Sequence, residues 1–249
     1  MKTILLVGVG TGNPEHVTIQ AINALNRADV LLIPDKGESK GELAQLRRDI
    51  VRRYVTNPAS RSVEFAPPVR DAGTPDYAER VADWHGELAR QFGDLLDQHV
   101  GDGGVAAFLV WGDPGLYDST IRIFDRLRAD APDAYGLEII PGISSIQALT
   151  AAHGIALNRI GEPVHITTGR RLAQGDRHGD TLVMLDGQAA FAGVDAELDI
   201  FWGAYLGTAD ELLISGRLRD VAERIIETRR LARERHGWIM DTYLLRARE

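Results

Sequence analysis

The loop at residues 110–119 carries the strongest chemical signal in this sequence. It follows an apolar run at 105–110, which predicts a strand buried on both faces, and it precedes a helical pattern. Such a loop leaves the carboxyl edge of a parallel sheet, where open α/β sheets bind their ligands. Gly112 and Gly115 let a ligand approach the backbone closely. We therefore expect this loop to line a ligand site.

A second glycine-rich turn follows the first apolar run, at residues 3–9. Gly8, Gly10 and Gly12 stand between a predicted strand and a predicted helix, a context typical of dinucleotide binding. Their spacing is Gly-x-Gly-x-Gly and not the usual Gly-x-Gly-x-x-Gly. Asp35 nevertheless lies near the end of the second predicted strand, where an acidic residue would hold a ribose. A nicotinamide-dependent oxidoreductase therefore remains an alternative.

Several other chemistries are excluded or disfavoured. The chain has no cysteine, which rules out disulfides, thiolate metal sites and cysteine nucleophiles. The seven histidines show no metal-binding spacing, so no metal is expected. Neither a Gly-x-Ser-x-Gly elbow nor a Walker phosphate loop occurs. His153, near a predicted helix end, and His165, in a predicted strand, are the two histidines that merit attention.

The composition is that of an ordinary globular protein, with 26% charged and 44% hydrophobic residues. The formal net charge of −8 argues against a nucleic-acid or anionic-membrane surface. No apolar run approaches the ~18 residues of a membrane span. The apolar start is too short for a signal peptide and enters a glycine turn at once. We therefore expect a cytoplasmic protein that binds neither nucleic acid nor membrane.

Strand and helix patterns alternate along the first part of the chain, which predicts an α/β fold with a mainly parallel sheet. The alternation pauses near 154–162, so we expect a domain boundary between residues 155 and 156. The predicted strands lie at 3–9, 30–33, 62–65, 105–110, 137–140, 164–168, 181–185, 200–206, 212–214 and 238–245. The predicted helices lie at 15–27, 42–54, 77–95, 119–127, 144–153 and 218–236.

Three motifs together resemble those of the class III tetrapyrrole methyltransferases. They are the turn at 8–15 with Thr18, the loop at 112–114 with Tyr117, and the segment 141–145. Their order and spacing match, and the likeness extends over essentially the whole chain. The resemblance implies transfer of a methyl group from S-adenosylmethionine to a tetrapyrrole, with S-adenosylhomocysteine as product.

The resemblance also implies an architecture of two αβα domains and a homodimer. The N-terminal domain, 1–155, would hold a mainly parallel sheet, the first two glycine motifs and a trough for the tetrapyrrole. The C-terminal domain, 156–249, would hold a mixed sheet and complete a cofactor cleft between the domains.

Four further blocks, at 15–18, 21–26, 156–163 and 237–245, narrow the resemblance. They are most similar to the family members that methylate C1 of precorrin-5 in aerobic cobalamin biosynthesis, with loss of the C20-derived two-carbon unit as acetate. We expect this reaction. Methylation of a different ring carbon is the nearest alternative, and a non-catalytic tetrapyrrole carrier is a third.

The resemblance assigns cofactor-binding residues motif by motif. Many relatives have proline at the position of Thr11, and relatives often have methionine where Asp186 aligns, so both residues depart from the family pattern. The expected contacts are Gly10, Thr11, Trp111, Gly112, Asp113, Leu116, Ser144, Ser145, Asp186 and Gly207, the last of these near the adenine.

The implied chemistry is chiefly a positioning task. Methyl transfer from a sulfonium requires the nucleophilic carbon in line with the methyl group at near-attack distance, and neither a metal nor a covalent enzyme intermediate. Asp113 could bind a polar cofactor group or simply cap a loop amide. The many carboxylates of the substrate call for local positive charge, for which Arg170 and Arg171 are our candidates. No residue stands out as the general base for acetate release.

Overall fold

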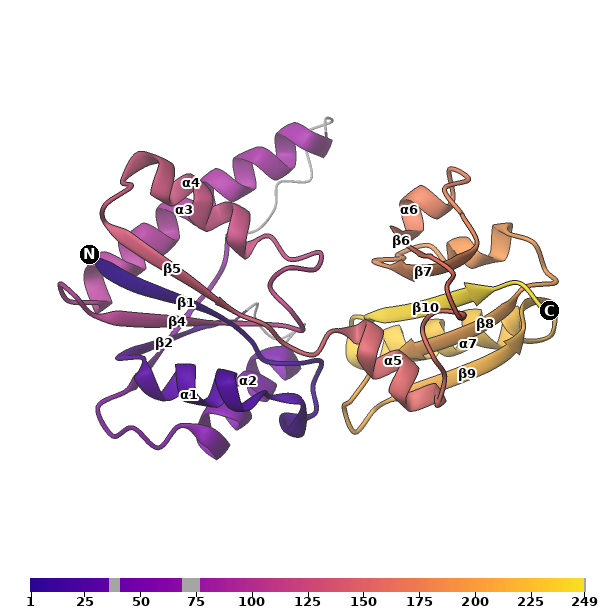
Figure 1. Cartoon of the computed structure of the whole chain (residues 1–249), viewed down its shortest axis with the longest axis horizontal. Helices are drawn as coiled ribbons and strands as arrows, with labels where there is room; N and C mark the ends of the chain where they lie inside the picture. Colours follow the sequence, from indigo (N-terminus) through magenta and orange to yellow (C-terminus); the bar gives the residue numbers. More distant parts are fainter. Residues whose placement is uncertain (36–40, 69–76, 249) are drawn as a thin grey trace. The chain divides into compact units, whose positions relative to one another are not determined.

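The computed structural model describes residues 1–35, 41–68 and 77–248. The chain divides into two compact units, here called unit 1 (Met1–Ile143) and unit 2 (Ser144–Glu249) (Figure 1). Within the described residues, no helix is long and apolar enough to cross a membrane.

Unit 1 is built on a five-stranded parallel sheet in the order β3-β2-β4-β1-β5, which confirms the expected parallel sheet. β1 lies between β4 and β5, and its last residue, Gly8, pairs with Val110 at the end of β4. The ends of these three neighbouring strands therefore reach the same edge of the sheet. The strands are β1 (Lys2–Gly8), β2 (Val30–Pro34), β3 (Arg61–Phe65), β4 (Val105–Val110) and β5 (Tyr135–Ile140).

Helices cover both faces of this sheet (Figure 1). Ile4 and Leu6 of β1 point into a core shared with α3 and α4, whereas Leu5 and Val7 point into a core shared with α1 and α2. The two-residue period of a strand explains why adjacent residues enter opposite cores, and why a strand buried on both faces is apolar throughout. The helices are α1 (Ile19–Arg27), α2 (Gly41–Tyr54), α3 (Tyr77–His99) and α4 (Thr120–Asp130).

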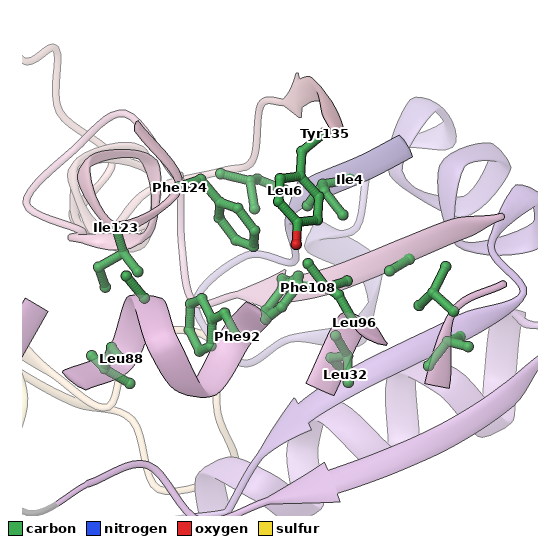
Figure 2. Packing of buried hydrophobic residues seen from close by; sticks show 14 of the residues in the cluster. Ile4, Leu6, Leu32, Leu88, Phe92, Leu96, Phe108, Ile123, Phe124 and Tyr135 are labelled. Carbon is green, nitrogen blue, oxygen red and sulfur yellow. The ribbon is translucent and has the colours of Figure 1, made fainter. Parts of the chain in front are cut away.

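Three aromatic rings join the sheet to its α3–α4 layer (Figure 2). Phe108 of β4 lies 4.7 Å from Phe92 of α3 and 4.9 Å from Phe124 of α4, measured between ring centroids. The rings of Phe92 and Phe124 are 5.4 Å apart. Aromatic pairs at these distances add to the stabilisation from burial, so this cluster anchors the layer behind the central strand.

The helix predicted at 15–27 is interrupted. A 3-10 turn, η1 (Pro14–His16), comes first, Val17 is extended, and α1 begins only at Ile19. The hydroxyl oxygen of Thr18 accepts a hydrogen bond from the N–H of Ala21 at 3.0 Å. Threonine is a favoured N-cap, which fixes the start of α1 at this point.

Unit 2 contains the mixed sheet that the sequence analysis expected, in the order β6-β7-β10-β8-β9. β6 and β7 are parallel, whereas the pairs β7–β10, β10–β8 and β8–β9 are antiparallel. Its strands are β6 (Val164–Thr168), β7 (Asp180–Met184), β8 (Asp199–Ala204), β9 (Leu212–Arg217) and β10 (Asp241–Arg246). Its helices are α5 (Ser145–His153), α6 (Gly169–Leu172), the 3-10 turn η3 (Ala190–Gly193) and α7 (Leu218–His236).

The division between the units falls before α5, whereas the boundary expected at 155/156 falls after it. α5 packs against β8, β9 and β10 of the mixed sheet. The contact with β8 is close, because a Cβ added at Gly203 would lie 2.9 Å from Cδ1 of Leu149. The alternation of strand and helix along the sequence does not reveal which sheet a helix covers.

Candidate functional site

The turns that follow β1, β4 and β5 meet at the carboxyl edge of the unit 1 sheet. Gly10 and Gly112 form an isolated antiparallel bridge, in which Gly112 N donates to Gly10 O at 2.8 Å and Gly10 N donates to Gly112 O at 3.3 Å. Gly142, in the third turn, is packed against the same carbonyl group, since an added Cβ would lie 2.1 Å from Gly112 O. The three turns, which are distant in the sequence, therefore pack together at this edge of the sheet.

The absence of side chains makes this convergence possible. A Cβ added at Gly8 would lie 2.6 Å from the backbone nitrogen of Gly142, which is closer than real Cβ contacts come. Gly112 also has a φ of +67°, a conformation that favours glycine. The three backbones can therefore approach one another only because these positions carry glycine.

Asp113 fastens the second turn to the third. One carboxylate oxygen, Oδ2, accepts a hydrogen bond from Gly142 N at 2.9 Å, and the other, Oδ1, accepts one from Gly115 N at 2.8 Å. Of the two roles considered for this aspartate, capping loop amides is the one that the structure displays. The carboxylate therefore shapes the site through the backbone.

Trp111 and Leu116, also in the second turn, keep partly exposed side chains. Arg47 of α2, which is not among the expected site residues, lies beside Trp111. Its guanidinium carbon is 6.0 Å from the centroid of the Trp111 ring. Its Nε donates to the carbonyl oxygen of Leu109 at 3.0 Å, at the end of β4.

Arg47 is a buried cation. Burial lowers the pKa of its guanidinium to about 10, an effect that the nearby charge of Asp118 opposes. One signal could have revealed it, because Ala44, Arg47 and Ile50 recur every three residues and all three are buried. A charged residue within an apolar helical stripe indicates a specific role for that residue. In the sequence this signal is weak, because α2 contains other arginines as well.

The remaining expected residues of the first and third motifs are held by local contacts. Thr11 is buried, with its hydroxyl oxygen 3.4 Å from Nδ1 of His16. Ser144 is the N-cap of α5 and forms a capping box with Gln147. The hydroxyl of Ser145 accepts a hydrogen bond from Thr242 at 3.0 Å. Ser144 and Ser145 belong to unit 2, and Thr11 belongs to unit 1.

The side chain of Asp186 is an internal anchor of unit 2. It is buried, and its carboxylate accepts hydrogen bonds from Gln188 N, from Ala190 N at 2.7 Å and from the Tyr243 hydroxyl at 2.7 Å. Burial raises the pKa of Tyr243, so this hydroxyl stays protonated and continues to donate. Gly207, in the turn after β8, donates its N–H to Glu211 at 2.7 Å.

Unit 2 also contains a cavity of about 930 Å³, which is large enough for a small-molecule ligand. It brings two of the expected residues together, Arg170 and Asp186. Arg171 is not among its lining residues and instead pairs with Asp176, at 3.3 Å. The lining includes Gly169, Arg170, Leu185, Asp186, Gln188 and Asp195.

The acidic residue that a dinucleotide-binding site would use to hold the ribose forms an ion pair within the protein. Asp35, which follows β2, pairs with Arg48 of α2 at 3.1 Å. The nicotinamide alternative therefore loses the support that Asp35 gave it.

Comparisons with known proteins agree with the motifs. The family described as tetrapyrrole (corrin/porphyrin) methylases matches residues 3–222. A relative from Sinorhizobium sp, named precorrin-6A synthase (deacetylating), is 56% identical over 249 residues, which cover 99% of this chain and 95% of the relative.

Solved structures give the same result. A crystal structure of a cobalamin-synthesis-related protein from Corynebacterium diphtheriae has a TM-score of 0.86 and 40% identity over the full length of both chains. Uroporphyrin-III C-methyltransferase from Thermus thermophilus, solved in complex with S-adenosylhomocysteine, shares the fold with a TM-score of 0.61 and 19% identity, covering 98% of this chain and 92% of that one. The chain therefore belongs to the tetrapyrrole (corrin/porphyrin) methylase family and is an S-adenosylmethionine-dependent methyltransferase.

Proposed function

We propose that this protein methylates C1 of precorrin-5 and releases the C20-derived two-carbon unit as acetate, giving precorrin-6A in cobalamin biosynthesis. The observation that carries the proposal is the 56% identity to the Sinorhizobium precorrin-6A synthase over nearly the whole of both chains. The shared residues extend through both units, so the likeness is not confined to the glycine motifs common to the family.

We further propose that the turns at 8–12 and 111–116 of unit 1 hold the cofactor. Two observations support this site. The missing Cβ atoms at Gly8 and Gly142 let the backbones of the three turns pack together, so their N–H and C=O groups gather at one edge of the sheet. Trp111 and Leu116 offer partly exposed apolar surface beside these turns. Bound there, S-adenosylmethionine supplies an activated methyl group on its sulfonium.

The residues of this chain then have a positioning role. Asp113 holds the second and third turns in register through its bonds to Gly115 and Gly142, so the backbone surface offered to the ligand is rigid. The guanidinium of Arg47 lies against the ring of Trp111 and helps to hold the ring in place. Rigid placement of the reacting groups is the main contribution that this reaction needs. Cofactor contacts from Gly10, Thr11, Ser144, Ser145, Asp186 and Gly207 remain predictions.

The carboxylates of the tetrapyrrole need cationic partners, and Arg170 remains the stronger candidate of the two arginines. It lines the 930 Å³ cavity of unit 2, and Arg171 does not. The homodimer and the cytoplasmic location rest on the family resemblance and the composition. Sedimentation velocity on the purified protein tests the dimer, and a mass of one chain would contradict it.

The reaction itself provides the direct test. The protein is incubated with precorrin-5 and S-adenosylmethionine carrying a ¹³C-labelled methyl group, and the products are followed by mass spectrometry and NMR. We expect one labelled methyl group at C1 and an equal amount of acetate. A labelled methyl group elsewhere, without acetate, would instead assign another ring carbon, and binding of precorrin-5 without turnover would indicate a carrier.

A binding measurement tests the cofactor separately. Titration calorimetry should detect S-adenosylhomocysteine and not NADPH. Binding of NADPH alone would overturn the methyltransferase assignment in favour of an oxidoreductase.

A further inference from the structure

Two histidines and one aspartate gather in unit 2, at the β6 edge of its sheet. The ligand atoms of His165, Asp176 and His178 all lie within 4.8 Å of one another. Oδ1 of Asp176 is 3.3 Å from Nε2 of His165 and 3.5 Å from Nε2 of His178. The two imidazole rings lie edge to face, with centroids 5.0 Å apart. One carboxylate oxygen therefore faces two imidazole nitrogens.

The surrounding structure fixes these groups in place. Thr167 is two residues after His165 on β6 and thus shares its face of the strand. Its hydroxyl donates to the second carboxylate oxygen of Asp176, Oδ2, at 2.9 Å, and Nε of Arg171 lies 3.3 Å from that oxygen. Both groups hold Oδ2, which leaves Oδ1 directed at the histidines.

The segment that carries Asp176 and His178, residues 173–179, is also held by its backbone. Asp176 N donates to the carbonyl oxygen of Arg171 at 3.1 Å, and His178 N donates to the hydroxyl of Thr181 at 3.2 Å. The cluster is therefore not a chance meeting of long, mobile side chains. It joins a strand to the connection that follows α6.

One nitrogen atom of the cluster lacks the hydrogen bond that a buried polar atom needs. Nε2 of His165 is shielded from solvent and makes no hydrogen bond within the described residues, although Oδ1 of Asp176 is near. Buried polar atoms are nearly always satisfied, so an exception requires an explanation. The hydroxyl of Thr167, above all, holds the pKa of Asp176 below its usual value, so the carboxylate is charged at neutral pH. An anionic oxygen then lies close to a nitrogen of each of the two imidazoles.

We propose that His165, Asp176 and His178 bind a divalent transition-metal ion of the Zn²⁺ type. Two imidazoles and a carboxylate are a ligand set that suits such ions. With metal–ligand distances of about 2.0–2.1 Å, ligands of a tetrahedral ion are about 3.4 Å apart, close to the two distances that Asp176 makes here. The exposed side of the cluster, at His178, leaves a fourth position for water.

The spacing of these three residues in the sequence does not indicate a metal site, which is why no metal was expected. The ligands come from a strand and from a loop eleven to thirteen residues further on, and only the fold brings them together. The proposal is independent of the methyltransferase reaction, because methyl transfer needs no metal. The charge of Arg171 next to Asp176 opposes a cation and so limits its affinity.

The test uses the full, untagged chain after treatment with a chelator. Zn²⁺ is titrated by calorimetry, and Co²⁺ serves as a probe with visible absorption. We expect one ion per chain. His178→Ala should weaken binding by about tenfold or more, the scale on which site residues contribute to metal affinity. The side chain of His178 is 74% exposed, so this variant keeps its fold, which circular dichroism verifies.

His99→Ala is the matched control, because His99 ends α3 in unit 1, whereas the cluster belongs to unit 2. It should bind Zn²⁺ as the unchanged protein does. Asp176→Asn should reproduce the effect of His178→Ala and abolish the visible Co²⁺ bands. The proposal is overturned if the unchanged protein takes up no Zn²⁺, or if both cluster variants bind it with unaltered affinity.

Discussion

Asp113 shows how one carboxylate can join two turns at the edge of a sheet through their backbone N–H groups. Its two oxygens accept hydrogen bonds from N–H groups of the second turn and of the third, whereas Gly10 and Gly112 link the first turn to the second through their backbones. At the scale of single residues, the site therefore depends on the arrangement of backbone amides more than on functional side chains.

We predict that Asp113→Asn weakens cofactor binding and destabilises unit 1. The asparagine amide has one acceptor oxygen, so one of the two backbone N–H groups loses its partner, at a cost of about 1–3 kcal/mol. The dissociation constant for S-adenosylhomocysteine should rise about tenfold, equivalent to about 1.4 kcal/mol. Calorimetry and urea unfolding measure the two effects.

The control is Asp125→Asn in α4 of the same unit. Asp125 is exposed, so the same loss of charge there should leave both measurements nearly unchanged. If Asp113→Asn behaved like this control in both measurements, the link between the turns would be unimportant for binding.

Single residues also mark the limits of sequence reasoning about this site. The glycines and Asp113 could be selected because their types are unusual at the end of a buried strand. Arg47 leaves only a weak signal, its place in an apolar helical stripe, because its partners, Leu109 and Trp111, lie more than sixty residues away. The family resemblance implies a cofactor contact at Asp186, and the structure shows that its carboxylate accepts a hydrogen bond from Tyr243 of another strand. Such roles depend on tertiary neighbours that no local pattern encodes.

At the scale of elements, the packing of three turns predicts the effect of Gly142→Ala. The new methyl group would lie 2.1 Å from the carbonyl oxygen of Gly112 and 2.8 Å from the backbone of Gly8. Because these neighbours are backbone atoms on other strands, the turns must separate, at a cost of about 1–3 kcal/mol or more. Urea unfolding should show this loss together with weaker binding of S-adenosylhomocysteine.

Gly101→Ala provides the comparison. A methyl group there meets nothing within 4 Å, so stability and binding should both be retained. Equal effects of the two substitutions would show that the loss arises from glycine content in general and not from the contact between the turns.

The attachment of α2 to the edge strand β3 predicts a pH dependence. Arg48 donates to both carboxylate oxygens of Glu64, each at 2.7 Å, and this pair lowers the pKa of Glu64. A lowered folded-state pKa stabilises the folded protein above the unfolded-state value of about 4.3, and this stabilisation is lost as the pH falls through the folded-state pKa. The stability difference between the unchanged protein and Arg48→Gln should therefore shrink below about pH 4.3.

Urea unfolding between acidic and neutral pH measures this difference. Arg52→Gln is the control, since Arg52 pairs with Asp49 inside the same helix. It should change stability by only a few tenths of a kcal/mol. A stability difference for Arg48→Gln that stays constant across this range would contradict the assigned role of Glu64.

Most elements could be predicted because their apolar patterns are strong. β1 and β4 are continuous apolar runs, and α7 has apolar residues at helical spacing. The start of α1 was wrong by four residues, since the sequence offered Pro14 and Glu15 as a first turn and the Thr18 cap prevailed. The short α6 was not predicted as a helix, because four residues carry too little periodicity.

At the scale of the whole molecule, the sequence correctly indicates two sheets of different type. It does so through motifs and alternation, which describe each stretch by itself. The packing of α5 on β8 is a property of the folded chain. The division into two units thus had to be read from contacts, and it raises the question of whether each unit unfolds on its own.

We predict that the two units respond separately to substitutions in their cores. Phe108→Ala removes the central ring of the unit 1 aromatic cluster and should cost about 3–5 kcal/mol. Tyr243→Phe removes one buried hydrogen bond to Asp186 in unit 2 and should cost about 1–3 kcal/mol. Hydrogen exchange followed by mass spectrometry reports the local free energy of opening in each unit. Phe108→Ala should accelerate exchange chiefly in β1, β4 and β5, and Tyr243→Phe chiefly in β7, β8 and β10. Acceleration of both sheets by either variant would mean that the chain opens as one cooperative body.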